Sequence, residues 1–231
     1  KRMEPVIDSH GGFVDKYIGD CIMALFDRCP DDSIESGIVM MKYLNALNAE
    51  LVESGKEPFE IGIGVNWGEM MLGTIGATGR MEGTVISDAV NTASRVESLT
   101  KIYGTPLLIT EAVYNRLVNP SKFDLRILDR VRVKGREEPV VIYEVLDVLS
   151  REKRRLRMSY QRDYQNSIQA FWAANFDEAL EGFNRCAELD PEDQAVQLFL
   201  RRCRWYRRQK VDTNWTGAFE VAALKNELDN I

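Results

Sequence analysis

Histidine, cysteine and proline are scarce in this sequence, and long apolar runs are absent from it. The 231 residues include one histidine, four cysteines and seven prolines. No apolar run approaches the roughly 18 residues of a membrane-spanning helix, and no secretory signal is visible. The cysteines show no metal-binding spacing. We therefore expect reduced thiols, no membrane span in this sequence and a cytoplasmic location, alone or as the cytosolic part of a membrane-attached protein.

Positive charge is not in excess either. Lysine and arginine number 30 against 36 aspartate and glutamate residues, which gives a net charge of −6. This balance offers no support for nucleic-acid binding. The length suits one or two domains with a sizeable core. Because the sequence opens without methionine on residues 1–5, which are typical of the middle of a helix, we expect it to be part of a longer protein.

Strand-like and helix-like segments are mixed over the first two thirds of the chain. A long helix opens at Asp31 with acidic residues in its first turn, and Gly55 ends it. A second helix begins at Ser87 or Asp88 and ends near Gly104. Strand-like segments are expected as hairpins at 12–27 and 59–74, and as strands at 82–86, 105–110, 123–134 and 139–147. These patterns predict an α+β fold whose largely antiparallel sheet is covered on one face by helices.

The first hairpin carries a lysine and a carboxylate four positions apart. Lys16 precedes Asp20, the turn contains Gly19, and the apolar run 22–26 follows as a buried strand. A carboxylate at the head of a buried strand is a natural ligand for a hard metal ion. Taken alone, the segment is also compatible with a plain hairpin, in which Lys16 is solvated or pairs with Asp15 and Asp20 is a turn residue.

Three motifs in a fixed order give this hairpin a context. They are G-x-V-D-K-Y-I-G-D at 12–20, V-N-x-A-S-R at 90–95, and V-R-V-K-G-R at 131–136 before a final I-Y-E-V strand. Over residues 1–148 the chain resembles the catalytic domain of class III nucleotidyl cyclases, of the adenylate type. The resemblance implies a ferredoxin-like fold that converts ATP to 3′,5′-cyclic AMP and pyrophosphate. It also implies two Mg²⁺ or Mn²⁺ ions per site, at the interface of a head-to-tail homodimer.

The resemblance assigns roles to residues of the hairpin and of a later strand. Asp20 matches a metal-binding aspartate. Lys16 matches the lysine that donates to N1 of adenine, and Thr84 matches the residue whose hydroxyl accepts from the adenine amino group. Guanylate cyclases have a similar scaffold but carry Glu and Cys-type residues at the positions of Lys16 and Thr84. Lys16 with Thr84 therefore indicates ATP as the substrate.

A helix and a strand end supply the remaining candidates. Asn91 and Arg95 are four residues apart and share one helical face. By resemblance, Asn91 positions the ribose and Arg95 stabilises charge on the transferring phosphate, a role that suits the guanidinium fork. The alternative is an ordinary helical Asn91 and an Arg95 that pairs with Glu97 or another acid. Lys134 matches a lysine that contacts the polyphosphate, with Arg136 as a near alternative.

Two departures from the family pattern stand out. Ser87 replaces the usual glycine before Asp88; serine can cap a helix, but a positive φ would cost it about 1 kcal/mol or more. The family's first metal aspartate, with its central strand, has no counterpart here, and we expect it upstream of Lys1. We therefore expect little turnover from these 231 residues alone. An inactive nucleotide-binding pseudo-cyclase and a helical interaction scaffold are the alternatives.

The composition changes after residue 148. Residues 149–163 form a basic, helix-forming linker, which we expect to be a solvated connecting helix. Residues 164–231 resemble one tetratricopeptide repeat and a third helix at about 192–209, with small and aromatic residues at 168–183 and Pro191 closing the second helix. The aromatic stripe of this segment is expected to form a core. Because an isolated repeat is rarely stable, we expect the module to dock on the cyclase domain or on a protein partner.

Overall fold

The computed structural model describes residues 2–75, 82–132, 138–209, 211 and 214–220. The chain divides into two compact units. The first unit holds residues 1–100 and 106–123, and the second holds 101–105 and 124–231. The segment 124–148 belongs to the same compact unit as the C-terminal helices. The boundary between the units therefore lies earlier in the chain than the predicted domain boundary at 148. That boundary and the linker limits at 149–163 stay predictions.

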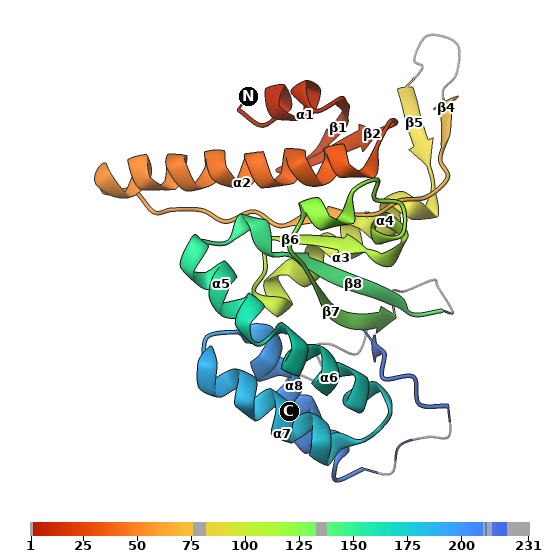
Figure 1. Cartoon of the computed structure of the whole chain (residues 1–231). Helices are drawn as coiled ribbons and strands as arrows, with labels where there is room; N and C mark the ends of the chain where they lie inside the picture. The colour runs from red at the N-terminus through yellow and green to blue at the C-terminus, as the bar shows by residue number, and fades with distance from the viewer. Residues whose placement is uncertain (1, 76–81, 133–137, 210, 212–213, 221–231) are drawn as a thin grey trace. The chain divides into compact units, whose positions relative to one another are not determined.

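The first unit combines three strand pairs with helices (Figure 1). Its elements are α1 (Glu4–Ser9), β1 (Gly12–Ile18), β2 (Cys21–Phe26), α2 (Pro30–Glu53), β3 (Ile63–Val65), β4 (Met71–Ile75), β5 (Glu82–Ile86), α3 (Asp88–Tyr103), β6 (Leu107–Thr110), α4 (Glu111–Tyr114) and a 3-10 turn (Pro120–Lys122). The last three residues of α3 count with the second unit. The predicted α+β character and both long helices are confirmed.

The long helix α2 shows why these predictions succeed. Pro30 occupies its first position, acidic residues fill its first turn, and Gly55 beyond its end has a φ of +71°. The buried side chains of Ile34, Met41 and Leu44 recur at helical spacing and form part of the core. Together these signals give a helix with one buried face.

Strand pairing in the first unit differs from the prediction for residues 59–74. β3 pairs in parallel with β6, and β4 pairs antiparallel with β5, so 59–74 is not a hairpin. The cause is Asn66, which follows β3 directly. Its side chain accepts from Thr110 Oγ1 at 2.8 Å, at the end of β6, and donates to the Ala89 carbonyl of α3 at 3.0 Å. These two bonds hold the chain beside β6 and α3.

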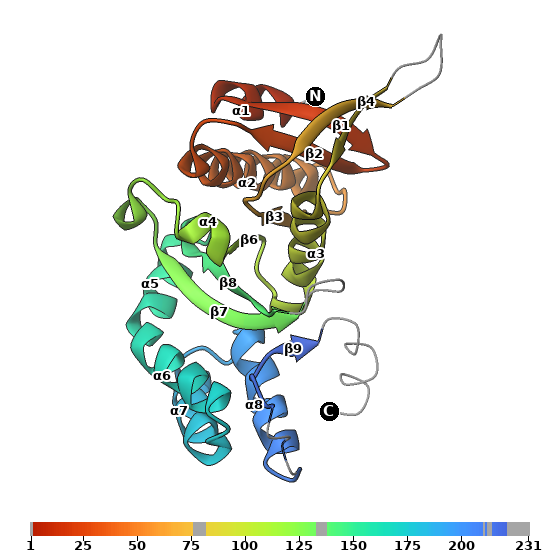
Figure 2. The same cartoon turned by 90° about the vertical axis from the view of Figure 1, so that its right-hand side faces the viewer.

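The second unit joins two strands of the predicted cyclase region to the C-terminal helices. Its elements are β7 (Leu125–Arg132), β8 (Val140–Val145), a 3-10 turn (Leu146–Val148), α5 (Arg151–Ser159), α6 (Gln161–Trp172), α7 (Phe176–Leu189), α8 (Gln194–Tyr206) and β9 (Phe219–Glu220). β7 pairs antiparallel with β8 and parallel with β9, which lies beside the end of β7 in Figure 2. Of the five pairings whose register is described, three are antiparallel and two are parallel, so the strands pair mainly antiparallel, as predicted, but with parallel pairings that the prediction did not include.

The three C-terminal helices pack around aromatic side chains. Phe171 meets Phe176 and Phe199 edge to face, with ring centroids 5.6 and 5.3 Å apart, and Phe183 stacks on Phe199 at 4.7 Å. Gly182 of α7 is necessary because a Cβ there would lie 2.0 Å from Ser167 Oγ of α6. The expected aromatic core is confirmed, and the likeness to a tetratricopeptide repeat stays a prediction.

The linker helix α5 differs from the solvated helix expected at 149–163. Arg157 is buried among the carboxylates of Glu144, Asp190 and Asp193. Arg154 pairs with Asp147 at 2.9 Å and also contacts Asp124. The basic residues of this helix therefore compensate acidic groups of their own unit, which the local sequence does not show.

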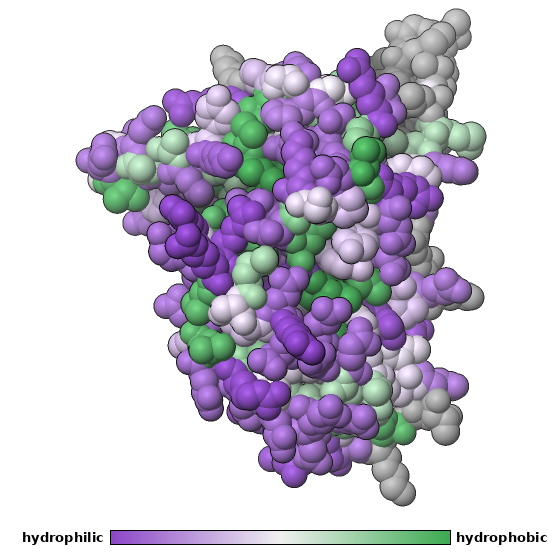
Figure 3. All heavy atoms as spheres, in the orientation of Figure 1, coloured by the Kyte–Doolittle hydropathy of each residue, from purple (hydrophilic) through white to green (hydrophobic). Residues whose placement is uncertain are grey.

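The surface in Figure 3 is mainly hydrophilic, with hydrophobic residues in scattered patches. Within the described residues, no helix combines the length and the apolar character needed to cross a membrane. All four cysteines are free thiols. Cys186 and Cys203 are buried, and burial raises the pKa of each thiol to about 12. These two thiols pack as small apolar side chains.

Candidate active site

The β1–β2 hairpin brings Lys16 next to a buried carboxylate. The register shifts between Val14 and Lys16, which leaves Asp15 as the extra residue of a β-bulge. Lys16 Nζ lies 3.3 Å from Asp15 Oδ2, and the lysine side chain is 35% exposed. Asp15 Oδ2 is buried and has no hydrogen-bond partner among the described residues. Lys16 therefore pairs with Asp15, as one of the two alternatives predicted, but its ammonium group remains accessible.

Asp20 occupies the hairpin turn itself. β1 ends at Ile18 and β2 starts at Cys21, so Gly19 and Asp20 form a two-residue turn in which Gly19 has a φ of +64°. The Asp20 side chain is exposed. The predicted buried strand after it is only partly buried, because the two-stranded hairpin packs by one face; of its residues only Leu25 is fully enclosed.

Helix α3 presents both of its candidate residues without protein partners. Asn91 is exposed and Arg95 is half-buried, one helical turn apart. Among the described residues, neither side chain takes part in a hydrogen bond or an ion pair, and Arg95 does not pair with Glu97. A half-buried guanidinium without a carboxylate is a ready site for an anionic group.

Buried and capping polar side chains hold the first turn of α3. Ser87 Oγ accepts from Ala89 N at 2.9 Å and donates to the Glu69 carbonyl at 2.6 Å. Ser87 therefore caps α3, as predicted, and its φ is not positive. Asn66 holds the Ala89 carbonyl from the other side at 3.0 Å. Sequence reasoning missed Asn66, although an Asn directly after an apolar strand run was a visible signal; its partner Thr110 is evident only in the structure.

Glycines allow α3 to lie directly on β3. A Cβ at Gly64 would stand 2.5 Å from the Ala93 carbonyl and 2.3 Å from the Glu97 backbone nitrogen. Burial first, and then the charges of Glu97 and Asp20, raise the pKa of the Cys21 thiol in the hairpin.

Of the remaining predicted site residues, Thr84 is placed by its backbone, and Lys134 lies outside the described residues. Thr84 lies in β5 opposite Gly73 of β4, as the backbone register shows. Lys134 and its alternative Arg136 lie outside the described residues. Within the described part of the chain, no hydrogen bond or ion pair joins Lys16, Asp20, Asn91 or Arg95 to another of the four. A site built from them needs further components.

Among the described residues, Asp20 is the candidate for a metal ligand. No three acidic, cysteine or histidine side chains gather there in a way that could hold an ion. The Asp20 carboxylate nevertheless fits a hard cation, since it is exposed and accepts no hydrogen bond from a described residue. Asp20 would be one ligand, and phosphate oxygens, water or other carboxylates would complete the coordination shell.

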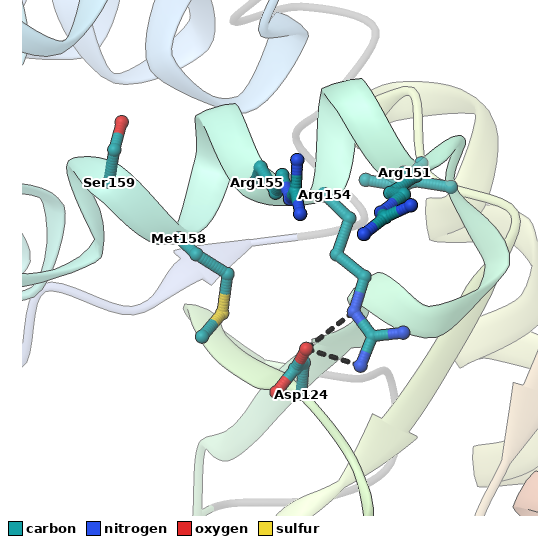
Figure 4. Close-up of a pocket in the computed structure, with 7 residues that line it drawn as sticks. Asp124, Arg151, Arg154, Arg155, Met158 and Ser159 are labelled. Atoms are coloured by element: carbon teal, nitrogen blue, oxygen red, sulfur yellow. Dashed lines mark hydrogen bonds and ion pairs between the residues drawn. The ribbon is translucent and has the colours of Figure 1, made fainter.

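A separate concave region lies on the second unit and holds none of the predicted site residues. It has a volume of about 640 Å³ and is lined by Asp124, Leu149, Arg151, Arg154, Arg155, Met158 and Ser159. Figure 4 shows the Arg154 guanidinium turned toward the Asp124 carboxylate across this hollow.

Comparison with known sequences gives relatives for most of the chain. An adenylate cyclase of Anabaena cylindrica is 48% identical over 149 residues, covering 62% of this chain and 30% of its own length. The terminal-differentiation specific adenylate cyclase of Dictyostelium discoideum is 36% identical over 205 residues, covering 86% of this chain and 10% of its own length. The chain therefore spans less than a third of either relative, and the second match extends into the C-terminal helices.

Solved structures give the same fold relationship. The guanylyl cyclase Cya2 is 31% identical with a TM-score of 0.55, covering 65% of this chain and 77% of that one. The adenylyl cyclase CyaB from P. aeruginosa is 31% identical with a TM-score of 0.54, covering 62% and 76%. Residues 1–146 match the family described as the adenylate and guanylate cyclase catalytic domain. With motifs, α+β fold and family match in agreement over more than half of its length, this chain belongs to the adenylate and guanylate cyclase family.

Proposed function

We propose that this chain is the catalytic part of an adenylate cyclase, which converts ATP to 3′,5′-cyclic AMP and pyrophosphate. The observation that carries the proposal is the pair Asn91 and Arg95, one turn apart on α3 with neither side chain engaged by another described residue. The similar solved structures include a guanylyl cyclase and an adenylyl cyclase, so the fold alone does not determine whether the substrate carries guanine or adenine. The relatives at 36% and 48% identity are both named adenylate cyclases.

In the proposed reaction the ribose 3′-oxygen attacks the α-phosphorus, and pyrophosphate leaves. Arg95 would hold oxygens of the transferring phosphate and stabilise the charge that develops there. Asn91 would hold the ribose so that its 3′-oxygen faces the phosphorus. Two Mg²⁺ or Mn²⁺ ions, when bound, would lower the pKa of the attacking hydroxyl and neutralise the polyphosphate. Asp20 would be one of their ligands, and Lys134 would contact the polyphosphate.

Base selection is assigned to the hairpin and to β5. The ammonium of Lys16 can only donate, so it suits the acceptor N1 of adenine and not the protonated N1 of guanine. The hydroxyl of Thr84 would accept from the adenine amino group. Asp15 supports this role because its carboxylate lies 3.3 Å from Lys16 Nζ and fixes the ammonium while leaving donors free.

We further propose that the site forms between two copies of the chain. Asp20 would come from one copy, whereas Lys16, Thr84, Asn91 and Arg95 would come from the other. This assignment agrees with the absence of any hydrogen bond or ion pair among Lys16, Asp20, Asn91 and Arg95 within the described residues. A cytoplasmic location, alone or as the cytosolic part of a membrane-attached protein, would give the enzyme access to ATP. The C-terminal helices would form a repeat-like module.

Nucleotide preference tests the proposal. The full-length protein, supplied with Mn²⁺, is expected to convert ATP to cyclic AMP at least ten-fold faster than it converts GTP. Lys16→Glu combined with Thr84→Cys is expected to reverse that order, because the new carboxylate can accept from N1–H of guanine and the new thiol can donate to O6. Lys42→Glu, an exposed charge reversal on α2, serves as the control and should leave the preference unchanged.

Two results would overturn parts of the proposal. If ATP is recovered unaltered with either metal, the enzyme assignment fails. If product forms but the double substitution leaves the preference unchanged, the roles of Lys16 and Thr84 fail while the enzyme assignment stands. The comparisons give no support to the alternative of an inactive nucleotide-binding relative.

A further inference from the structure

A fully buried carboxylate links three elements of the second unit. Asp129 of β7 is 0% exposed and follows the extra residue of a β-bulge. Its Oδ2 accepts from the Tyr103 hydroxyl at 2.6 Å and from Arg202 Nη1 at 2.5 Å, and its Oδ1 accepts from its neighbour's backbone nitrogen at 2.7 Å. Burial raises the pKa of this carboxyl, and the two side-chain donors oppose that rise.

Arg202 of α8 packs among aromatic rings and donates from both terminal nitrogens, whereas its Nε has no hydrogen-bond partner among the described residues. It is buried, and its guanidinium carbon lies 4.6 to 4.9 Å from the ring centroids of Phe171, Phe199 and Phe219. The Nη2 atom of Arg202 donates to the Gly217 carbonyl at 3.3 Å. Among the described residues, Asp129 is the only carboxylate that pairs with it. The position of the guanidinium is therefore set by the C-terminal helices.

Tyr103 is the last residue of α3. Gly104, with a φ of +62°, ends the helix immediately after it. The Tyr103 side chain is fully buried, so its hydroxyl has no access to water. α3 runs unbroken from Asp88 to Tyr103, and Arg95 stands eight positions before Tyr103. That separation is about 12 Å of helix, or roughly two turns.

We propose that Arg202, acting through Asp129 and the Tyr103 hydroxyl, positions helix α3 and with it Asn91 and Arg95. The C-terminal helices would then be part of the catalytic apparatus, supplying positioning residues from outside the cyclase region. This inference rests on the proposed function, since it concerns the same two residues. The match of the Dictyostelium adenylate cyclase over 86% of this chain agrees with a functional link between the cyclase region and these helices.

The structure also provides a matched control. The Tyr160 hydroxyl donates to Asp193 at 2.8 Å and to Asp190 at 3.2 Å, in the same unit and equally buried from solvent. No residue of α3 takes part in these bonds. Tyr103→Phe and Tyr160→Phe thus remove one buried hydroxyl each, and only the first loosens the end of α3.

Kinetics of the full-length protein test the inference. Tyr103→Phe is expected to lower kcat for cyclic AMP formation about ten-fold with a KM for ATP within two-fold of wild type, because small misplacement of catalytic groups acts on the transition state. Tyr160→Phe should change kcat less than two-fold. In an Arg95→Ala background, Tyr103→Phe should lower kcat by a clearly smaller factor than in wild type, since one of the two groups that it positions is gone. Equal effects in both backgrounds would overturn the inference.

Hydrogen exchange supplies a readout that does not need activity. Backbone amides of residues 91–100 should exchange at least five-fold faster in Tyr103→Phe than in wild type, and not in Tyr160→Phe. Unchanged exchange in Tyr103→Phe would also overturn the inference. If the wild-type protein makes no cyclic AMP, the proposed function fails, and the exchange experiment still decides whether Tyr103 holds α3.

Discussion

The arginines of the two units differ in how their charges are compensated. In the first unit, Arg95 is half-buried and pairs with no described residue. In the second, Arg126, Arg157 and Arg202 are at most 3% exposed, and each pairs with at least one buried carboxylate. A buried charge without a partner is costly, so the paired arginines are structural, whereas an unpaired one at the surface is poised for a ligand.

The largest network of the second unit lies between β7, β8 and the helices. Arg126 Nη2 is 2.6 Å from Glu144, and its Nη1 is 2.6 Å from Asp193, the N-cap residue of α8. Arg157 also contacts Glu144 and lies 3.9 Å from Asp193. Two positive charges are thus shared by facing carboxylates with almost no access to water. Removal of any one partner leaves the others only partly compensated.

Arg126→Met is the strongest test of this comparison. It removes the central cation and leaves Glu144 and Asp193 with only part of their compensation. We expect a loss of about 3–5 kcal/mol in the free energy of unfolding, as is typical when one member of a buried ion pair is removed. Urea denaturation followed by circular dichroism measures this loss. Arg204→Met, an exposed position on α8, should stay within about 0.5 kcal/mol of wild type. Equal stability of the two variants would refute a structural role for the network.

In contrast to Arg126→Met, Arg95→Ala should affect activity and not stability. Because the side chain has no described partner, its loss should change the free energy of unfolding by less than about 0.5 kcal/mol. In the full-length protein it should lower kcat by about 10²–10³-fold, the range seen when one donor to a developing negative charge is removed. Steady-state kinetics and urea denaturation on the same preparation separate the two effects. A stability loss equal to that of Arg126→Met would contradict the contrast between the units.

The pH dependence of stability probes the second unit alone. Burial would raise the pKa of Asp193, but Arg126 and Arg157 outweigh it and lower the pKa to about 2, against 3.8 for a free aspartate. The stabilisation is therefore fully present above about pH 5 and is lost as the pH falls from about 4 toward 2. The difference corresponds to about 2 kcal/mol.

Urea midpoints between pH 2 and pH 6 measure this dependence. Asp129 acts in the opposite sense, since burial raises the pKa of its carboxyl, so the quantity to compare is wild type minus Asp193→Asn. That difference should shrink as the pH falls below 4. A difference that stays constant over the range would show that Asp193 has the same pKa in the folded and the unfolded protein, so that Arg126 and Arg157 do not lower it.

The local signals in the sequence predicted α2, α3 and the β1–β2 hairpin because each is specified by residues near one another. Pro30 and Gly55 mark the ends of α2, and Gly19 specifies the hairpin turn. The pairing of β3 with β6 was not predictable in this way, since it depends on Asn66 reaching Thr110, 44 positions later. Apart from the β1–β2 hairpin, sequence reasoning found strand segments but not their partners.

The candidate site was predictable only through motifs. Asn91 and Arg95 share a helical face by spacing alone, yet their lack of protein partners became visible only in three dimensions. The role of Tyr103 was invisible in the sequence, because its partners Asp129 and Arg202 lie 26 and 99 positions away along the chain. A buried polar network has no local periodic signal, so it escapes patterns that detect helices and strands.

Ser87→Ala is expected to have the smallest effect of these substitutions. It tests the N-terminal end of α3, opposite to Tyr103. Ser87 Oγ accepts from Ala89 N and donates to the Glu69 carbonyl, so alanine removes the cap of the helix that carries Asn91. We expect a loss of about 1 kcal/mol in the free energy of unfolding, and a smaller loss for Ser87→Gly, because glycine is itself a tolerated N-cap residue. Ser98→Ala on the exposed side of α3 should cost less than either, since it removes only a bond to a carbonyl of the same helix. If alanine and glycine at position 87 prove equally costly, the bond to Glu69 and not the helix cap is the contribution of Ser87.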